Sequence, residues 1–343
     1  MSKKLYIIPI FIPHKGCPHD CSFCNQKKIA GEIIDVTCRD VDRIIHHYLN
    51  LFSEQAKTIE VAFYGGSFTG LSKEKQIELL KPAFDMKKKG IIHSIRLSTR
   101  PDYIDTEILE NLKEYGVSTI ELGLQSTDDN ILLLNNRGHT RDEIVKAAVL
   151  IKDFQFKLGL QMMVGLLGDN RQTIDKTAED IILLKPDFVR VYPTVVIQDT
   201  YLEKLYYKGK YRPFTLGDTV EICKDLLLKF EEKDIPVIRL GLQSTEDIQQ
   251  GKAIIAGPYH PAFREIVESE IYKDRIETKL KNKQLLKEAI LTVYCHPKVI
   301  SKIAGFKQCN KLYFINKYSL YKMIIKSCDN METKDVKVEI TVQ

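Results

Sequence analysis

Glycine and proline are scarce in this chain, and long apolar runs are missing. Eighteen Gly and 12 Pro among 343 residues are too few for a fibrous or low-complexity protein. No apolar run approaches the roughly 20 residues that a membrane-spanning helix needs. Lys3-Lys4 and Leu5–Ile10 resemble the start of a secretory signal, but Pro9 interrupts the run and no cleavage site of small residues follows. We therefore expect a cytoplasmic protein with no membrane partner.

Two common nucleotide-binding motifs are also missing. No G-x-G-x-x-G follows the first expected strand, and no P-loop sequence occurs. Both absences argue against a protein that binds dinucleotides or nucleoside triphosphates.

The positive charge of the chain is concentrated near its end. The whole chain carries 51 basic and 46 acidic residues, a net charge of +5. Residues 271–343 contain 15 of the basic and 7 of the acidic residues, a net of +8, which leaves a net of −3 for the rest. Such a bias indicates either a polyanionic partner or an ordinary solvated face rich in lysine.

Short β-rich runs alternate with amphipathic stretches along the first 240 residues, which indicates parallel βαβ units. A partial (β/α) barrel and an open doubly wound sheet both fit this pattern. The expected strands are Leu5–Ile12, Ile59–Tyr64, Ile91–Ser98, Ser118–Leu124, Phe156–Val164, Phe188–Tyr192 and Val237–Leu240. The expected helices are Val41–Leu51, Lys73–Lys88, Thr106–Tyr115, Arg141–Phe154, Gln172–Leu184 and Val220–Lys233.

The composition of the chain changes after Glu270, where lysine-rich segments and short β-like runs begin. These runs are Leu291–Tyr294, Leu312–Ile315 and Val336–Val342. We therefore expect two domains, a barrel with its extension over 1–270 and a small basic α/β unit over 271–343.

Polar and glycine-rich clusters follow the expected strands. Three cysteines follow the first strand and Gly65-Gly66-Ser67 the second, while Thr99–Asp102, Gln125-Ser126 and Gly165 follow the next three. In a parallel barrel, the carboxyl ends of the strands meet at one face and carry the active site. The sequence therefore predicts a single site built from these clusters.

Cys17, Cys21 and Cys24 have the spacing C-x3-C-x2-C with an aromatic residue before the last cysteine. Three thiolates on one tight loop can hold three irons of a cubane cluster and leave the fourth iron open. A zinc site completed by His14 or His19 is the alternative. The other five cysteines are scattered singly, which is typical of buried, unreactive thiols.

The cysteine motif after the first strand resembles that of the radical S-adenosylmethionine (SAM) superfamily. Several further segments are similar to the radical domain of the Elongator catalytic subunit, which modifies wobble uridines in tRNA. These segments are FYGGSFTG, STRPDYID, ELGLQST, RGHT and RVYPTVVIQDTYLEKLYYKGKY. More distantly, the chain resembles oxygen-independent coproporphyrinogen oxidase. The resemblance implies a partial (β/α)6 barrel, a 4Fe-4S cluster bound by the three cysteines, and SAM chelated at the open iron. An electron from the cluster would cleave SAM to methionine and a 5′-deoxyadenosyl radical.

The resemblance also implies a set of SAM-binding residues. Gly65 and Gly66 would let backbone approach the methionyl amino group. Gln125 and Ser126 match a SAM-contacting position, and Arg137 matches the residue whose guanidinium pairs with the SAM carboxylate. Gln161 stands where relatives place a polar group near the ribose. A second LGLQST word at Leu240 lacks the arginine partner, so the SAM site is expected at the first.

Two departures from the family pattern limit what the resemblance implies. Ser98 stands where relatives commonly carry a glutamate that contacts SAM. No acetyl-CoA pyrophosphate loop follows Tyr211, so the acetyltransferase step of Elongator is not expected. The sequence predicts a radical SAM enzyme that acts on tRNA or another RNA through its basic C-terminal unit, with an electron donor such as ferredoxin or flavodoxin. A radical SAM enzyme acting on a small molecule such as a porphyrinogen, and a non-catalytic zinc-stabilised RNA-binding protein, are the alternatives.

Overall fold

The chain forms two compact units in the computed structural model. It describes residues 4–12, 20–25, 35–52, 57–242, 252–281, 283 and 287–342. The first unit comprises Met1–Thr219 and Leu226–Tyr259, and the second comprises Val220–Asp225 and His260–Gln343. The boundary expected after Glu270 falls inside a helix of the second unit, so that unit begins earlier in the chain than its change of composition.

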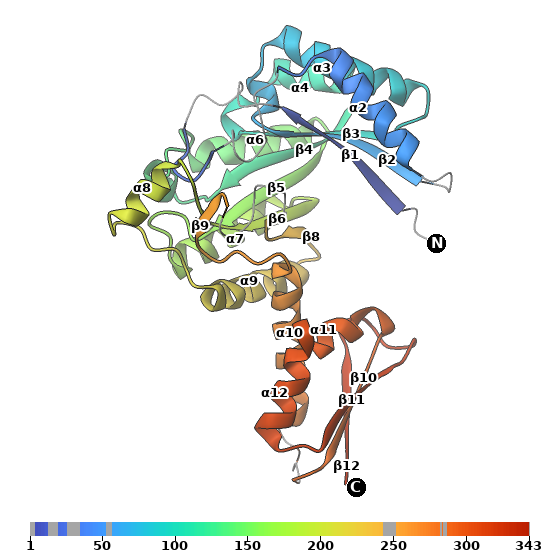
Figure 1. Ribbon diagram of the computed structural model, residues 1–343. Helices are drawn as coiled ribbons and strands as arrows, with labels where there is room; N and C mark the ends of the chain where they lie inside the picture. Colours follow the sequence, from blue (N-terminus) through green and yellow to red (C-terminus); the bar gives the residue numbers. More distant parts are fainter. Residues whose placement is uncertain are drawn as a thin grey trace. The chain divides into compact units, whose positions relative to one another are not determined.

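The first unit is built on a curled parallel sheet (Figure 1). Its strand order β1-β2-β3-β4-β5-β6-β8 follows the order along the chain, as expected of successive right-handed βαβ units. The strands are β1 (Lys4–Ile12), β2 (Lys57–Gly65), β3 (Ser94–Thr99), β4 (Val117–Gln125), β5 (Lys157–Val164), β6 (Phe188–Pro193) and β8 (Val237–Leu240). All seven expected strands are present, and the predicted partial barrel is confirmed.

Helices connect these strands and pack against the sheet. The main ones are α2 (Cys38–Leu51), α3 (Lys73–Lys88), α4 (Thr106–Glu114), α6 (Arg141–Asp153), α7 (Arg171–Leu184) and α9 (Leu216–Glu231). Figure 1 shows α2, α3 and α4 over the strands β1 to β4. Local sequence fixes where each helix begins. At α6, Thr140 Oγ1 accepts the amide of Glu143, and the Glu143 carboxylate accepts the amide of Thr140, which is a capping box.

The two faces of the sheet differ in polarity. Successive side chains of a strand point to opposite faces. In β4, Ile120, Leu122 and Leu124 are fully buried on one face, whereas Glu121, Gly123 and Gln125 lie on the other. The neighbouring strands alternate in the same way, so an apolar face meets the helices and a polar face lines the inside of the barrel. The predicted site residues Gln125 and Gln161 lie on this inner face.

Three shorter elements complete the mouth of the barrel. A two-stranded antiparallel sheet joins β7 (Val196–Ile197) to β9 (Ile254–Ala256). The short helices α5 (Asp129–Leu134) and α8 (Tyr201–Tyr207) follow the carboxyl ends of β4 and β7. These elements pack near the cysteine loop described below.

The second unit packs three helices on one face of a three-stranded sheet. The helices are α10 (Phe263–Leu280), α11 (Ile300–Ala304) and α12 (Cys309–Tyr318), and the strands are β10 (Ile290–Cys295), β11 (Lys322–Ser327) and β12 (Val336–Thr341). The central strand β10 pairs in parallel with β11 and antiparallel with β12. Leu291, Val293 and Cys295 of β10 face the core with Ile276 and Phe314 of the helices. The predicted small α/β unit is confirmed.

The β-like run Leu312–Ile315 was predicted incorrectly, because it lies inside α12. Phe314 is fully buried whereas Leu312 is 57% exposed, so the run buries one side only. Periodicity over four residues cannot separate a strand from a helix.

The helices were also compared with the length and apolar character that a membrane span requires. Within the described ranges, no helix is long and apolar enough to cross a bilayer.

Candidate active site

Two of the three predicted cluster ligands lie on a pinned turn at the mouth of the barrel. Cys21 is 8% exposed and Cys24 is half-buried, and the amide of Cys24 donates to the carbonyl of Cys21 at 3.1 Å. Between them, Ser22 bonds through both its amide and its hydroxyl to Asn135, at 3.1 and 2.7 Å. Cys17, His14 and His19 lie outside the described residues, so the structure tests neither the third thiolate ligand nor the zinc alternative.

Further contacts hold the cysteine turn in place. The amide of Leu202, at the start of α8, donates to the carbonyl of Ser22 at 2.7 Å. Asn136 Nδ2 donates to the carbonyl of Asp20 at 3.0 Å, and Phe23 packs against the apolar cluster that contains Leu202. The turn is therefore anchored by α8 and by Asn135 and Asn136, the two residues that follow α5.

Arg137 contacts the cysteine turn directly. Its guanidinium is buried, with Nη1 3.2 Å from Cys21 Sγ and Nη2 2.5 Å from the carbonyl oxygen of Gly123. The carbonyl of Arg137 accepts a hydrogen bond from Arg100, which forms an ion pair with Asp102 at 2.9 Å. A fixed positive charge therefore lies against the sulfur of one of the predicted cluster ligands.

Gln125 lies beside Arg137 and adopts an unusual backbone conformation. It is the last residue of β4, and its φ of +65° is left-handed, which costs free energy for a residue with a side chain. A Cβ on Gly123 would come within 2.9 Å of Gln125 Nε2 and 3.8 Å of Arg137 Nη2. The side chain of Gln125 therefore folds back over Gly123, where glycine alone leaves it room.

Two buried polar atoms beside the cysteine turn have no hydrogen-bond partner within the described ranges. They are Gln125 Oε1 and Arg137 Nε. Buried polar groups are almost always hydrogen-bonded, so an acceptor and a donor without partners next to a cysteine turn indicate a ligand. The amino and carboxylate groups of a methionyl moiety supply the complementary donor and acceptor. The residues present therefore fit SAM beside a thiolate-bound cluster.

Gly65 and Gly66 shape the neighbouring strand end. Gly65 has a φ of +104°, and a Cβ there would lie 2.5 Å from the carbonyl oxygen of Ile12. The amide of Gly66 donates to that same oxygen at 3.0 Å. Glycine is thus required at 65 to bring the end of β2 close to the end of β1, after which the cysteine segment begins.

Ser126 and Gln161 are turned differently from the sequence-based expectation. Ser126 Oγ lies 3.3 Å from Thr177 Oγ1 on α7 and accepts the amide of Asp128 at 3.1 Å, so this hydroxyl faces the helix layer. Gln161 points into the barrel, but its Nε2 donates to Glu121 Oε2 at 3.0 Å. The structure thus groups Cys21, Gln125 and Arg137, and places Gln161 and the Ser126 side chain apart from them.

A row of buried charges, which the sequence analysis missed, crosses the inner face of the sheet. Glu121, fully buried, pairs with Arg96 Nη1 at 2.7 Å and Arg190 Nε at 2.6 Å. Arg96 Nη2 pairs in turn with Glu60 Oε2 at 2.7 Å. Burial alone would lower the pKa of Arg190, but Glu121 together with Tyr192 and Tyr64 outweighs it and raises this pKa, so the guanidinium stays charged. The sequence did carry a signal for this row, because its charged residues stand at inward-facing positions of otherwise apolar strands.

We call Glu60, Arg96, Glu121 and Arg190 the charge row. One of its carboxylates lies near Ser98, the position where the family resemblance implied a glutamate that contacts SAM. Ser98 of β3 is the register partner of Glu121 on β4, so a carboxylate does lie one strand away. Both of its oxygens are occupied by arginines and by Gln161. Glu121 therefore does not supply the SAM-binding carboxylate that the family resemblance led us to expect at position 98.

His139, in the RGHT word, is a neutral neighbour of the site. Burial, followed by the nearby charges of Arg137 and Arg100, lowers the pKa of His139 to about 3. Its Nε2 lies 3.4 Å from the carbonyl oxygen of Leu124. The imidazole adds no further positive charge next to Arg137 at neutral pH.

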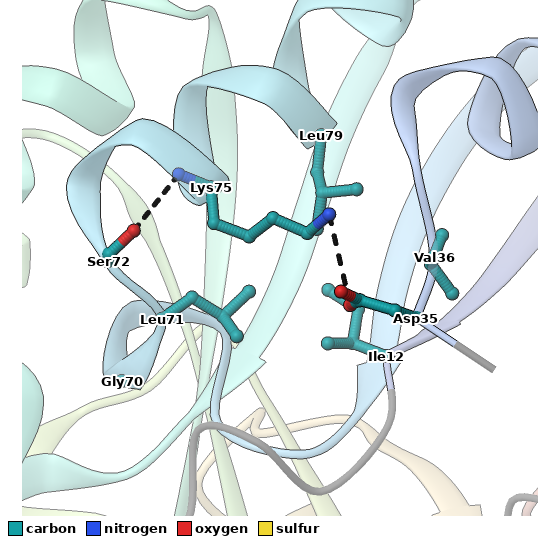
Figure 2. A pocket seen from close by; sticks show the side chains of 8 residues that line it. All are labelled: Ile12, Asp35, Val36, Gly70, Leu71, Ser72, Lys75 and Leu79. Atoms are coloured by element: carbon teal, nitrogen blue, oxygen red, sulfur yellow. Dashed lines mark hydrogen bonds and ion pairs between the residues drawn. The ribbon is translucent and has the colours of Figure 1, made fainter. Parts of the chain in front are cut away.

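A cavity of about 250 Å³ lies next to Ile12, the last residue of β1, and the first turn of α3 (Figure 2). Lys75 crosses it, 3.9 Å from Asp35 and 3.0 Å from Glu78. The lining residues are Ile12, Asp35, Val36, Gly70, Leu71, Ser72, Lys75 and Leu79. None of the predicted site residues that the structure describes lines this cavity.

The fold and the site define the class of this protein. The profile of the radical SAM superfamily matches residues 11–181, and that of the radical SAM C-terminal domain matches residues 186–273. The chain belongs to the radical SAM superfamily and is an enzyme. Members of this superfamily use SAM and a 4Fe-4S cluster, which are therefore its cofactors.

Among its relatives, the uncharacterized protein MJ0486 of Methanocaldococcus jannaschii is 31% identical over 66% of this chain and 72% of that protein. A tRNA uridine(34) acetyltransferase from the same organism is 31% identical over 41% of this chain and only 28% of its own length. The structure of Elp3 from Methanocaldococcus infernus superposes with a TM-score of 0.63 at 20% identity, covering 80% of this chain and 64% of that one. The last comparison establishes similarity of fold.

Proposed function

We propose that this enzyme cleaves SAM reductively and directs the resulting radical to a base in tRNA or another RNA. Cys17, Cys21 and Cys24 would hold the cluster. When bound, the cluster supplies one electron to SAM, which yields methionine and a 5′-deoxyadenosyl radical. The observation that carries the proposal is the contact of Arg137 with Cys21 beside the unpaired Oε1 of Gln125.

Arg137 and Gln125 would bind the methionyl end of SAM. Arg137 Nε, which has no partner within the described ranges, is a donor suited to a carboxylate, and Gln125 Oε1 is an acceptor suited to an ammonium group. At Gly65 and Gly66 no side chain would keep the methionyl end of SAM away from the backbone. The cofactor would thus be oriented by groups that exist before it binds, which avoids ordering them at that moment.

Gln161 would act one layer deeper in the barrel. Its Nε2 is occupied by Glu121 and lies 3.5 Å from Ser98 Oγ, which fixes the amide plane. Its carbonyl oxygen then remains to accept a ribose hydroxyl. The hydroxyl of Ser126 faces α7, so only its backbone would serve the cofactor.

The RNA substrate is proposed from the relatives and from the charge of the C-terminal unit. Relatives from three organisms are named tRNA uridine(34) acetyltransferases. The chain spans 28%, 39% and 51% of their lengths, so we carry over only the radical step and not acetyl transfer. The basic unit would hold the RNA, and a ferredoxin or flavodoxin would deliver the electron.

Anaerobic reconstitution with iron and sulfide tests the radical step. We expect about four irons per chain and conversion of SAM to 5′-deoxyadenosine with dithionite, stimulated by tRNA. A protein that binds one zinc and leaves SAM intact would contradict the proposal and support the zinc-stabilised alternative. Turnover that responds to a porphyrinogen but not to tRNA would overturn the RNA substrate alone.

A further inference from the structure

One segment of the second unit carries charge of a single sign. From Ala289 to Cys328, which spans β10, α11, α12 and β11, the chain contains no Asp or Glu. Its seven lysines are Lys298, Lys302, Lys307, Lys311, Lys317, Lys322 and Lys326. The segment alone therefore exceeds the net charge of +5 of the whole chain. Neither family profile extends past residue 273, so the family assigns it no role.

Most of this charge is not neutralised by neighbouring carboxylates. Lys302 pairs with Glu268 at 3.0 Å and Lys317 with Glu277 at 2.7 Å. Within the described ranges, the other five lysines have no carboxylate at ion-pair distance. A surplus of fixed positive charge on one small module attracts a polyanion.

The loop between α11 and α12 has a conformation that its residues do not favour. It consists of Gly305, Phe306, Lys307 and Gln308, with φ of +80° at Gly305, +52° at Lys307 and +63° at Gln308. A Cβ on Gly305 would lie 2.8 Å from the amide nitrogen of Asn310, so only glycine fits there. Lys307 and Gln308 are exposed and adopt the left-handed conformation at a cost.

Packing beneath the loop holds this conformation. The side chain of Asn310 is buried, and its Nδ2 donates to the carbonyl of Ser269 on α10 at 2.9 Å. The ring of Phe306 meets His260 edge-on with centroids 5.0 Å apart, and Lys307 Nζ lies 5.5 Å from the Phe306 centroid. The exposed tip is therefore rigid, and a ligand would not have to order it.

We propose that this helix–loop–helix binds the sugar–phosphate backbone of an unpaired RNA strand. RNA-binding KH modules clamp the backbone of about four nucleotides with a G-x-x-G loop. Gly305 occupies the position of the first glycine, and Gln308 adopts the left-handed backbone that a second glycine would supply. Lys307 and Lys311 on the loop and α12, and Lys322 and Lys326 on the edge strand β11, provide phosphate contacts. The choice of RNA as the polyanion rests on the proposed function.

A matched pair of charge reversals tests this inference in the full-length reconstituted enzyme. Lys307→Asp removes the loop charge, and Asp tolerates a left-handed backbone. Lys185→Asp is the control, because Lys185 is also exposed, has a φ of +48°, and lies in the barrel unit. With a fluorescent unpaired RNA, we expect about tenfold weaker binding and a salt slope shallower by about one for Lys307→Asp. Lys185→Asp should bind within about twofold of wild type.

The outcomes separate this inference from the proposed function. Equal weakening by both variants, or wild-type affinity for Lys307→Asp, would overturn the loop site while leaving an RNA substrate in place. If the wild-type enzyme converts SAM to 5′-deoxyadenosine but binds no RNA, the RNA substrate falls as well. Should Lys307→Asp unfold, Lys311→Gln on the adjoining helix α12 replaces it. We then expect about threefold weaker binding, and unchanged binding would contradict the site. Equal affinity for unpaired and fully duplex RNA would contradict a single-strand site.

Discussion

Two groups of buried polar side chains lie inside the barrel and differ in whether their charges are paired with one another. In the charge row, Glu121 and Glu60 alternate with Arg96 and Arg190 across the strands, at 2.6 to 2.7 Å. In the group at the mouth, Gln125 and Arg137 each retain a buried atom without a partner in the described ranges. Arg96 Nε of the charge row also has no hydrogen-bond partner within the described ranges, but its guanidinium is neutralised by two carboxylates. The charge row therefore needs no ligand to balance its charge, whereas the atoms at the mouth lie next to the cysteine turn, where a ligand would complete their hydrogen bonds.

Breaking the charge row should produce the largest loss of stability. Glu121→Gln leaves Arg96 and Arg190 buried with insufficient negative charge, and we expect a loss of about 3–5 kcal/mol in the free energy of unfolding. Urea denaturation of the apoprotein measures it. The control is Glu107→Gln, whose pair with Lys73 at 2.7 Å is exposed and should contribute far less to stability, because solvent screens exposed ion pairs. Equal effects of the two substitutions would mean that the charge row is not structural.

Asp169 offers a contrasting buried carboxylate that has hydrogen bonds but no arginine. Burial raises its pKa from 3.8 to about 6, against the opposing hydrogen bonds from Thr173 and the amides of Gly165 and Leu166. The folded state therefore binds this proton more tightly than the unfolded state, so stability falls as the pH rises from about 4 to 6.

Asp169→Asn should remove this pH dependence. Relative to wild type, the variant should gain about 2 kcal/mol of unfolding free energy between pH 4 and pH 7. Urea denaturation at a series of pH values measures the difference. A constant difference across this range would show that Asp169 titrates normally.

Removing an unsatisfied group should affect cofactor binding and not stability. Gln125→Ala deletes the acceptor at the mouth, and we expect the KM for SAM to rise about tenfold, as for a lost hydrogen bond to a charged group. The free energy of unfolding should change by less than about 1 kcal/mol. The control is Gln155→Ala, because Gln155 shares the left-handed backbone, with a φ of +63°, but is exposed. If both variants shift the KM equally, Gln125 is not a SAM contact.

The smallest effect is expected at the end of the charge row. Tyr64 OH accepts a hydrogen bond from Arg190 Nη2 at 3.1 Å, and burial followed by Glu121 raises the pKa of Tyr64 to about 12. Tyr64→Phe should cost about 1 kcal/mol of stability and leave the KM for SAM unchanged. A large change in KM instead would place Tyr64 in the cofactor site.

The sequence was sufficient to predict the strands and the cysteine turn because both depend on local patterns. The β-rich runs give the sheet, and the C-x3-C-x2-C spacing identifies the turn that contains Cys21 and Cys24. The charge row was not predicted, because the partners of Arg96 lie on two other strands and only the register brings them together. Periodicity also failed over short apolar runs, as in α12.

The placement of Arg137 shows the same limit at the site itself. Its spacing from Gln125 indicated a link to SAM, but not that its guanidinium would rest against Cys21 Sγ. That contact depends on how α5 returns the chain to the cysteine turn. The direction of the Ser126 hydroxyl toward Thr177 likewise follows from helix packing and not from the motif.

Transfer of deuterium from RNA to the cofactor product tests the central claim most directly. The reconstituted enzyme is incubated anaerobically with SAM, dithionite and a tRNA made from fully deuterated nucleotides, and the mass of 5′-deoxyadenosine is measured. The account predicts that 5′-deoxyadenosine gains one deuterium, because its radical removes the atom from the RNA. Abundant 5′-deoxyadenosine without deuterium, formed at the same rate with and without RNA, would contradict it.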